Sequence, residues 1–329
     1  MENNCSTESI AKAVREYAGV TRKHAIGEII HCLKLDSDDV LVSFGEDAAL
    51  IKNNEDGILL AADGIWSMLM EADPYWAGFC SVLVNVHDIA AMGGRPLAMV
   101  DILSIQNENI CHEVLRGMAD ASKKFNVPIV GGHLHPDSKF SAVDVAIMGI
   151  VKIENAIFSH TAKPKDRIIA AIDLNGRIHP SCALNWDSAT IRSAQEVRSQ
   201  IAIMQKLGEK HLLTAGKDIS NPGVIGTLGM LLETSEAGAE VELSRIPRPD
   251  LLTLGISFSQ WVRMYPGMGF IVTAKEENVS EVISMFESVG ITASDIGHVN
   301  DTGNLTIKYN EKESSVFDLT KEGIMCLFD

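Results

Sequence analysis

Acidic side chains recur in this chain beside glycine, at positions where the sequence predicts the ends of strands and helices. Asp47 lies two residues after Gly45, and Asp63 directly precedes a glycine. Asp218 opens a short segment that also ends in glycine. Mg²⁺ prefers carboxylate oxygens, and glycine lets the backbone come close to a phosphate chain. The pattern therefore indicates a site for a divalent metal and a phosphate-bearing ligand.

The most informative acid is Asp88, because the helix predicted around it is apolar on nearly every side. This helix is expected over Trp76–Met92 and ends at a pair of glycines that begins with Gly93. Asn85 lies three residues before Asp88 and therefore on the same stripe. A buried carboxylate near a helix C-terminus needs a cation or hydrogen-bond donors. Asp88 is interpreted as a metal ligand, with a buried salt bridge as the alternative.

The other acids are less specific when they are taken singly. An Asp-Gly pair is typical of a turn, so for Asp63 taken alone a turn is favoured over a metal ligand. For Glu46, which follows Gly45, a solvated turn acid is favoured over a metal ligand.

A second glycine-rich stretch runs from Gly131 to His135 after a predicted strand. Two histidines without a third ligand nearby are weak evidence for zinc. We favour a phosphate-facing loop at the mouth of an active site, formed by Gly131 and Gly132 with His133 pointing inward. A loop without a chemical role is the alternative.

Composition and missing motifs exclude several classes of function. The formal charge is −16, with 44 acidic residues against 28 Lys and Arg, and nucleic-acid binding requires a basic surface. No apolar run reaches the ~18 residues of a membrane span, and the polar start lacks a signal core. The cysteines show no CxxC spacing, so a cytoplasmic protein is expected. Walker, dinucleotide-binding, Gly-x-Ser-x-Gly and His-Glu-x-x-His motifs do not occur.

Predicted strands and helices alternate in both halves of the chain, which favours an α/β or α+β fold. A Thr-Ala-Lys-Pro-Lys-Asp stretch at 161–166 marks a domain junction. We predict an N-terminal domain over 1–155 and a C-terminal domain over 160–329. The region His179–Trp186 is a candidate wall of an acceptor pocket, with an ordinary loop as an equally supported alternative.

The chain resembles the aminoimidazole ribonucleotide (AIR) synthetase-like, or PurM-like, superfamily over essentially its whole length. This superfamily includes thiamine-monophosphate kinase, selenophosphate synthetase and the hydrogenase-maturation dehydratase. The Asn-x-x-Asp-x-x-Ala-Met-Gly-Gly-x-Pro run is highly specific, and the other motifs support it. The overall likeness is greatest to the synthase-related proteins of methanogenic archaea, and Gly131-Gly132-His133 is most similar to selenophosphate synthetase. The motifs occur in the superfamily's order, at 45–49, 61–64, 85–96, 131–133 and 218–223.

The resemblance implies a dimer-forming mixed sheet in the N-terminal domain and an α+β C-terminal domain, with ATP and Mg²⁺ bound in the cleft between the domains. Asn85 would orient Asp88 or contact phosphate, and His133 would lie near the phosphates, so these three are the implied catalytic residues. The implied metal ligands are Asp47, Asp63, Asp88 and Asp218. The implied nucleotide contacts are Gly45, Asp47, Asp63, Gly93, Gly131, Gly132 and Asp218.

Two departures from the superfamily bear on the reaction. Selenophosphate synthetases carry a reactive Cys or Sec with a nearby Lys in a glycine-rich N-terminal segment. Here Cys5 lacks that context, and the nearest cluster of cationic residues is Arg22-Lys23-His24. Thiamine-monophosphate kinase has Asp-x-Ser-Asp-Gly in the second domain, where this chain has Asn221-Pro222.

The sequence therefore predicts an ATP- and Mg²⁺-dependent phosphoryl-transfer enzyme, a kinase or synthetase, that acts as a homodimer on a small-molecule acceptor. A non-catalytic ATP-binding partner in a maturation complex is the alternative.

Overall fold

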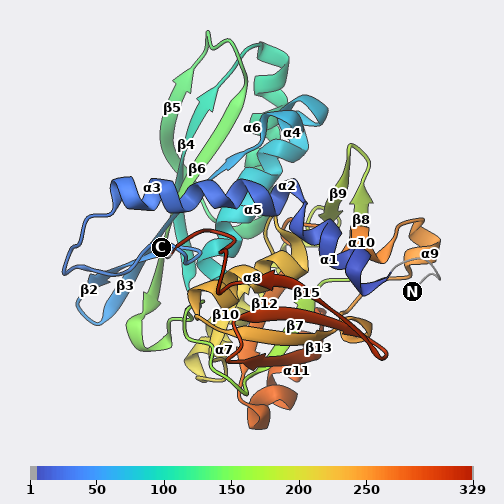
Figure 1. The fold of residues 1–329 in the computed structure, drawn as a ribbon. Coiled ribbons are helices and arrows are strands. Elements are labelled where there is room, and N and C mark those ends of the chain that lie inside the picture. The colour runs from blue at the N-terminus through green and yellow to red at the C-terminus, as the bar shows by residue number, and fades with distance from the viewer. Residues whose placement is uncertain (1–5, 328–329) are drawn as a thin grey trace.

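Helix α5 (Pro74–Ala91) packs against both halves of the protein in the computed structural model, which describes residues 6–327 (Figure 1). It contacts strands β3 and β6 of an N-terminal sheet, and strand β10 and helix α7 of the C-terminal half. The N-terminal sheet has six strands in the order β1 (Val40–Val42), β2 (Ala49–Asn53), β3 (Asp56–Ile65), β6 (Ala142–Lys152), β4 (Arg95–Ser104) and β5 (Ile129–His135).

The C-terminal sheet has seven strands in the order β10 (Ala215–Asp218), β12 (Gly269–Ala274), β7 (Arg167–Ile172), β13 (Thr292–Asn300), β11 (Gly238–Glu242), β14 (Asn304–Tyr309) and β15 (Lys312–Asp318). A separate hairpin is formed by β8 (Arg177–His179) and β9 (Cys182–Asp187). The other α-helices are α1 (Thr7–Arg15), α2 (Ala18–Thr21), α3 (Ala25–Leu33), α4 (Ser67–Ala72), α6 (Glu108–Phe125), α7 (Ala194–Glu209), α8 (Gly223–Thr234), α9 (Leu251–Leu254), α10 (Phe258–Trp261) and α11 (Val279–Glu287).

Both sheets are mixed. Strands β4 and β5 pair in parallel, as do β11 and β14, whereas the remaining pairs are antiparallel. This arrangement confirms the predicted α/β (α+β) class. No helix of the described residues is long and apolar enough to cross a membrane.

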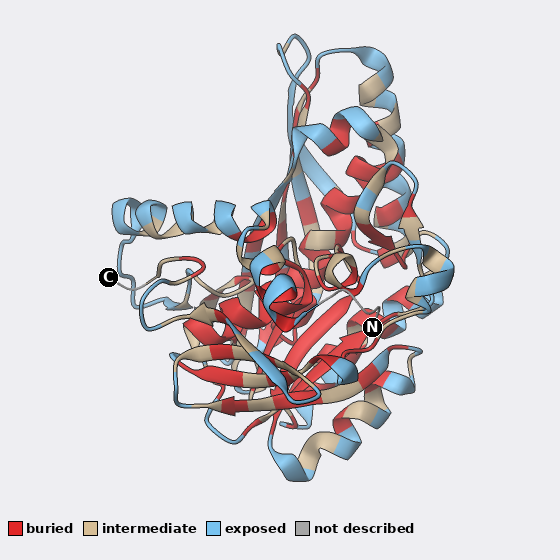
Figure 2. Cartoon of the chain, turned by 45° about the vertical axis from the view of Figure 1, so that its right-hand side comes forward, coloured by how far each residue is buried: buried red, intermediate tan, exposed pale blue. Residues whose placement is uncertain are grey.

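The sequence at its two ends explains where α5 begins and ends. The side chain of Asp73 accepts a hydrogen bond from the Trp76 amide at 2.9 Å, and Pro74 occupies the first turn. The chain leaves the helix at Gly93, whose φ of +72° favours glycine. Nearly all residues between these points are buried, which confirms the predicted buried helix (Figure 2).

The N-terminal sheet has one covered face and one open face. Leu59, Val145 and Ile147 point to the covered face and belong to the core that includes α5. Four apolar side chains of the other face are 41–50% exposed. We call these residues, Leu60, Val100, Ile102 and Met148, the outer sheet face.

Helix α1 belongs with the C-terminal sheet, although the predicted division assigns its residues to the N-terminal domain. Ile10 and Val14 are fully buried in the same core as the C-terminal strands. The Arg15 guanidinium donates to the Ser315 carbonyl at 2.6 Å. The N-terminal sheet ends with β6 at Lys152 and the C-terminal sheet begins with β7 at Arg167, and α1 packs with the second of these sheets.

The predicted loop that begins at Gly131 is wrong, because residues 131–135 belong to β5. This edge strand is exposed, so no apolar alternation marks it, and it is held by its parallel pairing with β4. Gly132 lies opposite Asp101, and a Cβ at this position would collide with the Asp101 carboxylate. Close strand pairing is thus a structural reason for this glycine.

Candidate functional site

Three carboxylates from distant parts of the sequence meet in one place. Asp47 comes from the segment between β1 and β2, Asp88 from the last turn of α5, and Asp218 from the end of β10. One oxygen from each side chain lies within 4.8 Å of the others. Three oxygens at this spacing suit a hard divalent cation such as Mg²⁺.

Lys217 supplies the positive charge at this cluster, and the sequence did not single it out. Its ammonium group forms an ion pair with Asp47 and donates to the Gly45 carbonyl at 3.3 Å. Only 5% of each charged side chain in the pair is exposed. Burial lowers the pKa of Lys217, but the carboxylates of Asp47 and Glu46 outweigh burial and raise it. The lysine therefore stays charged and compensates part of the acidic cluster.

Asp88 carries the least compensated charge of the cluster. Burial, followed by repulsion from Asp63, Asp218 and Asp47, raises the pKa of Asp88 well above its usual range. Neither a hydrogen bond nor an ion pair reaches its carboxylate from residues 6–327. A carboxylate in this position gains most from a bound cation.

Asp63 lies in the same cavity but outside the group of three. It follows Leu59 and Ala61 in the alternation of β3, so it points to the side of the sheet that faces α5. Asp63 is exposed where it borders the cavity. Partial desolvation of its carboxyl group and the charge of Asp47 raise the pKa of Asp63, against the opposing effect of Lys23.

Glu46 is neither a solvated turn acid nor a member of the metal group. Its side chain is 4% exposed, and it accepts hydrogen bonds from the Ser159 amide at 2.7 Å and from His160 Nδ1 at 2.5 Å. Burial raises the pKa of Glu46, but these bonds and the charge of Lys217 outweigh burial and lower it. Glu46 thereby ties the Gly45–Asp47 segment to the interdomain linker.

The cluster lines a cavity of about 510 Å³ between the two halves of the protein. Gly45, with a φ of +97°, forms part of its wall, and Lys23 and Ile26 close one side. Leu60, a residue of the outer sheet face, also lines the cavity. The cavity therefore extends to that face of the sheet. Its size lies within the range of small-molecule sites.

Asn85 and Gly93 do not line this cavity. Asn85 is fully buried within α5 and donates from Nδ2 to the Ser81 carbonyl at 2.8 Å, whereas its Oδ1 has no partner among the described residues. Gly93 forms the turn after α5, where its neighbours are Asn155 and Ile157. Both residues shape the helix that presents Asp88.

Gly131, Gly132 and His133 are also remote from the acidic cluster within one chain. They lie on edge strand β5, which β4 and β6 separate from β3. His133 packs edge-on against His135 with ring centroids 4.6 Å apart. The inward orientation predicted for His133 is therefore not found in the single chain.

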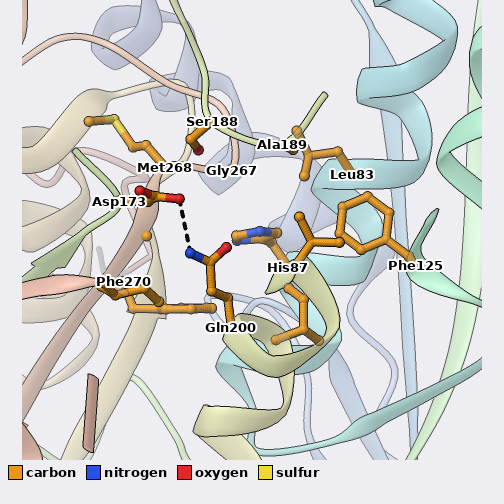
Figure 3. A pocket seen from close by; sticks show the side chains of 14 residues that line it. Leu83, His87, Phe125, Asp173, Ser188, Ala189, Gln200, Gly267, Met268 and Phe270 are labelled. Carbon is orange, nitrogen blue, oxygen red and sulfur yellow. Dashed lines mark hydrogen bonds between the residues drawn. The ribbon is translucent and has the colours of Figure 1, made fainter. Parts of the chain in front are cut away.

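A small buried cavity of about 20 Å³ lies on the opposite side of α5 (Figure 3). His87 points into it, stacked on Phe270 with ring centroids 5.3 Å apart, and its Nδ1 has no hydrogen-bond partner among the described residues. The Gln200 side chain donates to Asp173 at 2.9 Å across the same space. Burial lowers the pKa of His87 to about 4, so this histidine is neutral at physiological pH.

Comparisons with known proteins show the family to which this chain belongs. Models of the AIR synthase related protein match residues 45–151 for the N-terminal domain and 176–310 for the C-terminal domain. The chain belongs to this family, which confirms the resemblance seen in the motifs.

An uncharacterized protein of Methanocaldococcus jannaschii is 46% identical over 96% of this chain and 98% of its own length. Among solved structures, PurL of Thermotoga maritima complexed with ADP has a TM-score of 0.76 at 19% identity, over 95% of this chain and 51% of that one. AaThiL complexed with AMPPCP and TMP has a TM-score of 0.67 at 17% identity, over 89% of this chain and 96% of that one. These likenesses confirm the two-domain, PurM-like fold.

Proposed function

We propose that this protein is an ATP- and Mg²⁺-dependent phosphotransferase or synthetase that acts on a small-molecule acceptor. The convergence of Asp47, Asp88 and Asp218 on one cavity carries the proposal. Two structural neighbours, PurL with ADP and AaThiL with AMPPCP, bind adenine nucleotides on the same fold.

The donor set fits a magnesium ion. Asp47, Asp88 and Asp218 would hold it, with Asp63 as a further ligand at the cavity mouth. Mg²⁺ bound there would neutralise charge on the nucleotide phosphates. Gly45 leaves room beside the phosphates, and Lys217 holds Asp47 in place from the second domain.

A homodimer is part of this proposal. The outer sheet face exposes four large apolar side chains on adjacent strands, as expected for an association surface. A second subunit on this face would also cover the cavity opening at Leu60. His133 and the glycines of β5 would then reach a nucleotide only in the partner subunit's cavity, because within one chain they lie too far away.

Thermal melts test the nucleotide proposal directly. ATP with Mg²⁺ should raise the melting temperature, since ligand at 100-fold its Kd stabilises by about 2.7 kcal/mol. ATP without Mg²⁺ should give a much smaller shift. Asp218→Asn should remove the Mg²⁺-dependent part, whereas Asp301→Asn, at an exposed turn, should leave it unchanged. An unaltered melt of the wild-type protein with ATP and Mg²⁺ would refute the proposal.

An ADP-release assay with candidate acceptors separates an enzyme from the alternative, a non-catalytic nucleotide-binding partner. An enzyme forms ADP only with the right acceptor. A binding partner shows the thermal shift but no ADP formation with any acceptor. The position of Cys5 lies outside the described residues, so the N-terminal segment is best tested by its deletion in the same assay.

A further inference from the structure

A second cavity, of about 310 Å³, adjoins the acidic one. Four residues line both cavities and so form a shared wall: Lys23, Asp63, Asp218 and Ser220. A molecule in the second cavity would therefore lie next to the proposed metal and the nucleotide phosphates. The region His179–Trp186, which the sequence indicated as a candidate wall of an acceptor pocket, contributes Ser181, Cys182 and Asn185 to its lining.

The body of the second cavity is apolar. Leu69, Cys80 and Pro266 are buried in its walls, and Trp66 covers its mouth with 48% of its surface exposed. Its volume suits a small organic molecule rather than a metal ion or free phosphate. The exposed indole gives such a molecule a flat surface against which a ring can stack.

Two cations, Arg22 and Lys23, line this cavity in addition to the carboxylates of Asp63 and Asp218 in the shared wall. The Arg22 guanidinium lies 5.0 Å from the centroid of the Trp66 ring, and Lys23 follows it in the chain. Neither cation has an acidic side chain of residues 6–327 within ion-pair distance, although the charge of Lys23 acts against the raised pKa of Asp63 and of Asp218. Deeper inside, Asn185 is fully buried; its Nδ2 makes no close hydrogen bond among these residues, and its side chain faces the Tyr265 phenol, whose pKa it lowers against the effect of burial. These donors favour an anionic oxygen on the ligand.

The walls provide no general base for a neutral acceptor. No histidine lines either cavity. Burial raises the pKa of Tyr265 to about 12 and also raises the pKa of Cys80 and Cys182, so these groups keep their protons at neutral pH. The two acids of the shared wall, Asp63 and Asp218, are proposed ligands of the metal. An acceptor that is already an anion needs no base.

We propose that the second cavity binds the phosphoryl acceptor, and that this acceptor is an organic anion with an apolar, ring-bearing body and a carboxylate or phosphate monoester group. The inference rests on the proposed function. The anionic oxygen attacks the γ-phosphorus of ATP, a new P–O bond forms, and the bond to the β-phosphate oxygen breaks. The electron pair leaves with ADP, and no proton is transferred. Arg22 and Asn185 hold the acceptor, while Lys23 lies where the phosphoryl group passes.

Ligand-observed fluorine NMR, without nucleotide, tests acceptor binding. The probes are para-fluorophenylacetate, para-fluorophenyl phosphate and the neutral para-fluorobenzyl alcohol. We expect binding of the carboxylate, the phosphate or both, and the difference between them identifies the anionic group. Arg22→Met and Trp66→Ala should weaken anion binding at least about tenfold. Arg116→Met is the matched control, because Arg116 also stacks on an aromatic ring, Tyr75, at 4.8 Å, but outside the cavity.

Absence of anion binding, equal binding of the alcohol, or unchanged binding in Arg22→Met and Trp66→Ala would overturn the acceptor assignment. The thermal shift with ATP and Mg²⁺ is measured separately on the same variants. Failure of the nucleotide proposal therefore appears as a lost ATP effect in the wild-type protein, and failure of the acceptor proposal as lost selectivity for the anionic probes.

Discussion

Lys217 and Asp47 form a buried ion pair that joins the two halves of the protein at the acidic cavity. Lys217 lies on β10 of the C-terminal sheet, and Asp47 lies between the first two strands of the N-terminal sheet. The adjacent Asp218 amide also donates to Asp47 at 3.2 Å. The geometry of the metal-binding group therefore depends on how the two sheets are docked.

Replacement of this lysine should destabilise the protein until a metal binds. In Lys217→Met, Asp47 loses its cation while four other acids, Glu46, Asp63, Asp88 and Asp218, remain nearby. Breaking a buried pair costs about 3–5 kcal/mol. A large fall in the urea midpoint is expected without metal, with partial recovery in Mg²⁺. Lys152→Met, which breaks the exposed pair with Asp56, should change the midpoint little. Equal losses in both variants would contradict this role of Lys217.

Neutralisation of Asp88 should have the opposite effect on the metal-free protein. The raised pKa of Asp88 means that its charge opposes folding at neutral pH, because the unfolded carboxyl ionises more easily. Asp88→Asn should therefore stabilise the apo protein by on the order of 1 kcal/mol. The same variant should lose the Mg²⁺-dependent thermal shift. A variant that is less stable without metal and keeps that shift would show that Asp88 has a structural role instead.

The neutral state of His87 predicts a particular pH dependence of stability. The folded pKa is about 4 and the unfolded value about 6.5, so the unfolded chain takes up the proton first as the pH falls. Stability is present above pH 6.5 and is lost between this value and about pH 4, by up to roughly 3 kcal/mol. In His87→Phe, urea midpoints should fall less across this range. His112→Gln, on the exposed side of α6, should follow the wild type.

A charge on the outer sheet face should separate the proposed dimer. Ile102 is 50% exposed on this face, so Ile102→Glu would place a carboxylate in an apolar interface. Sedimentation velocity should show a dimer for the wild-type protein and a monomer for the variant. Leu252→Glu, at a side chain that is 76% exposed on α9, should remain dimeric. A monomeric wild-type protein at micromolar concentration would refute the interface.

The sequence alone predicted the features that depend on local pattern. The apolar run around Asp88 identified a buried helix, because a helix surrounded by protein needs no polar face. Acids next to glycine identified three positions of the cavity, and the order of the motifs identified the family. Each of these signals lies within a short stretch of sequence, so it can be recognised without knowledge of the tertiary structure.

Only the tertiary structure showed which of these residues meet. It brought Asp47, Asp88 and Asp218 together, placed Asp63 at the cavity mouth, and kept Gly131 to His133 on a distant edge strand. The partner of Asp47 stayed hidden, and only the His179–Trp186 side of the second cavity was anticipated, because Lys217, Arg22 and Trp66 belong to no local motif. These residues lie near the site because the two sheets dock against α5. The spacing of residues along the chain does not predict this docking.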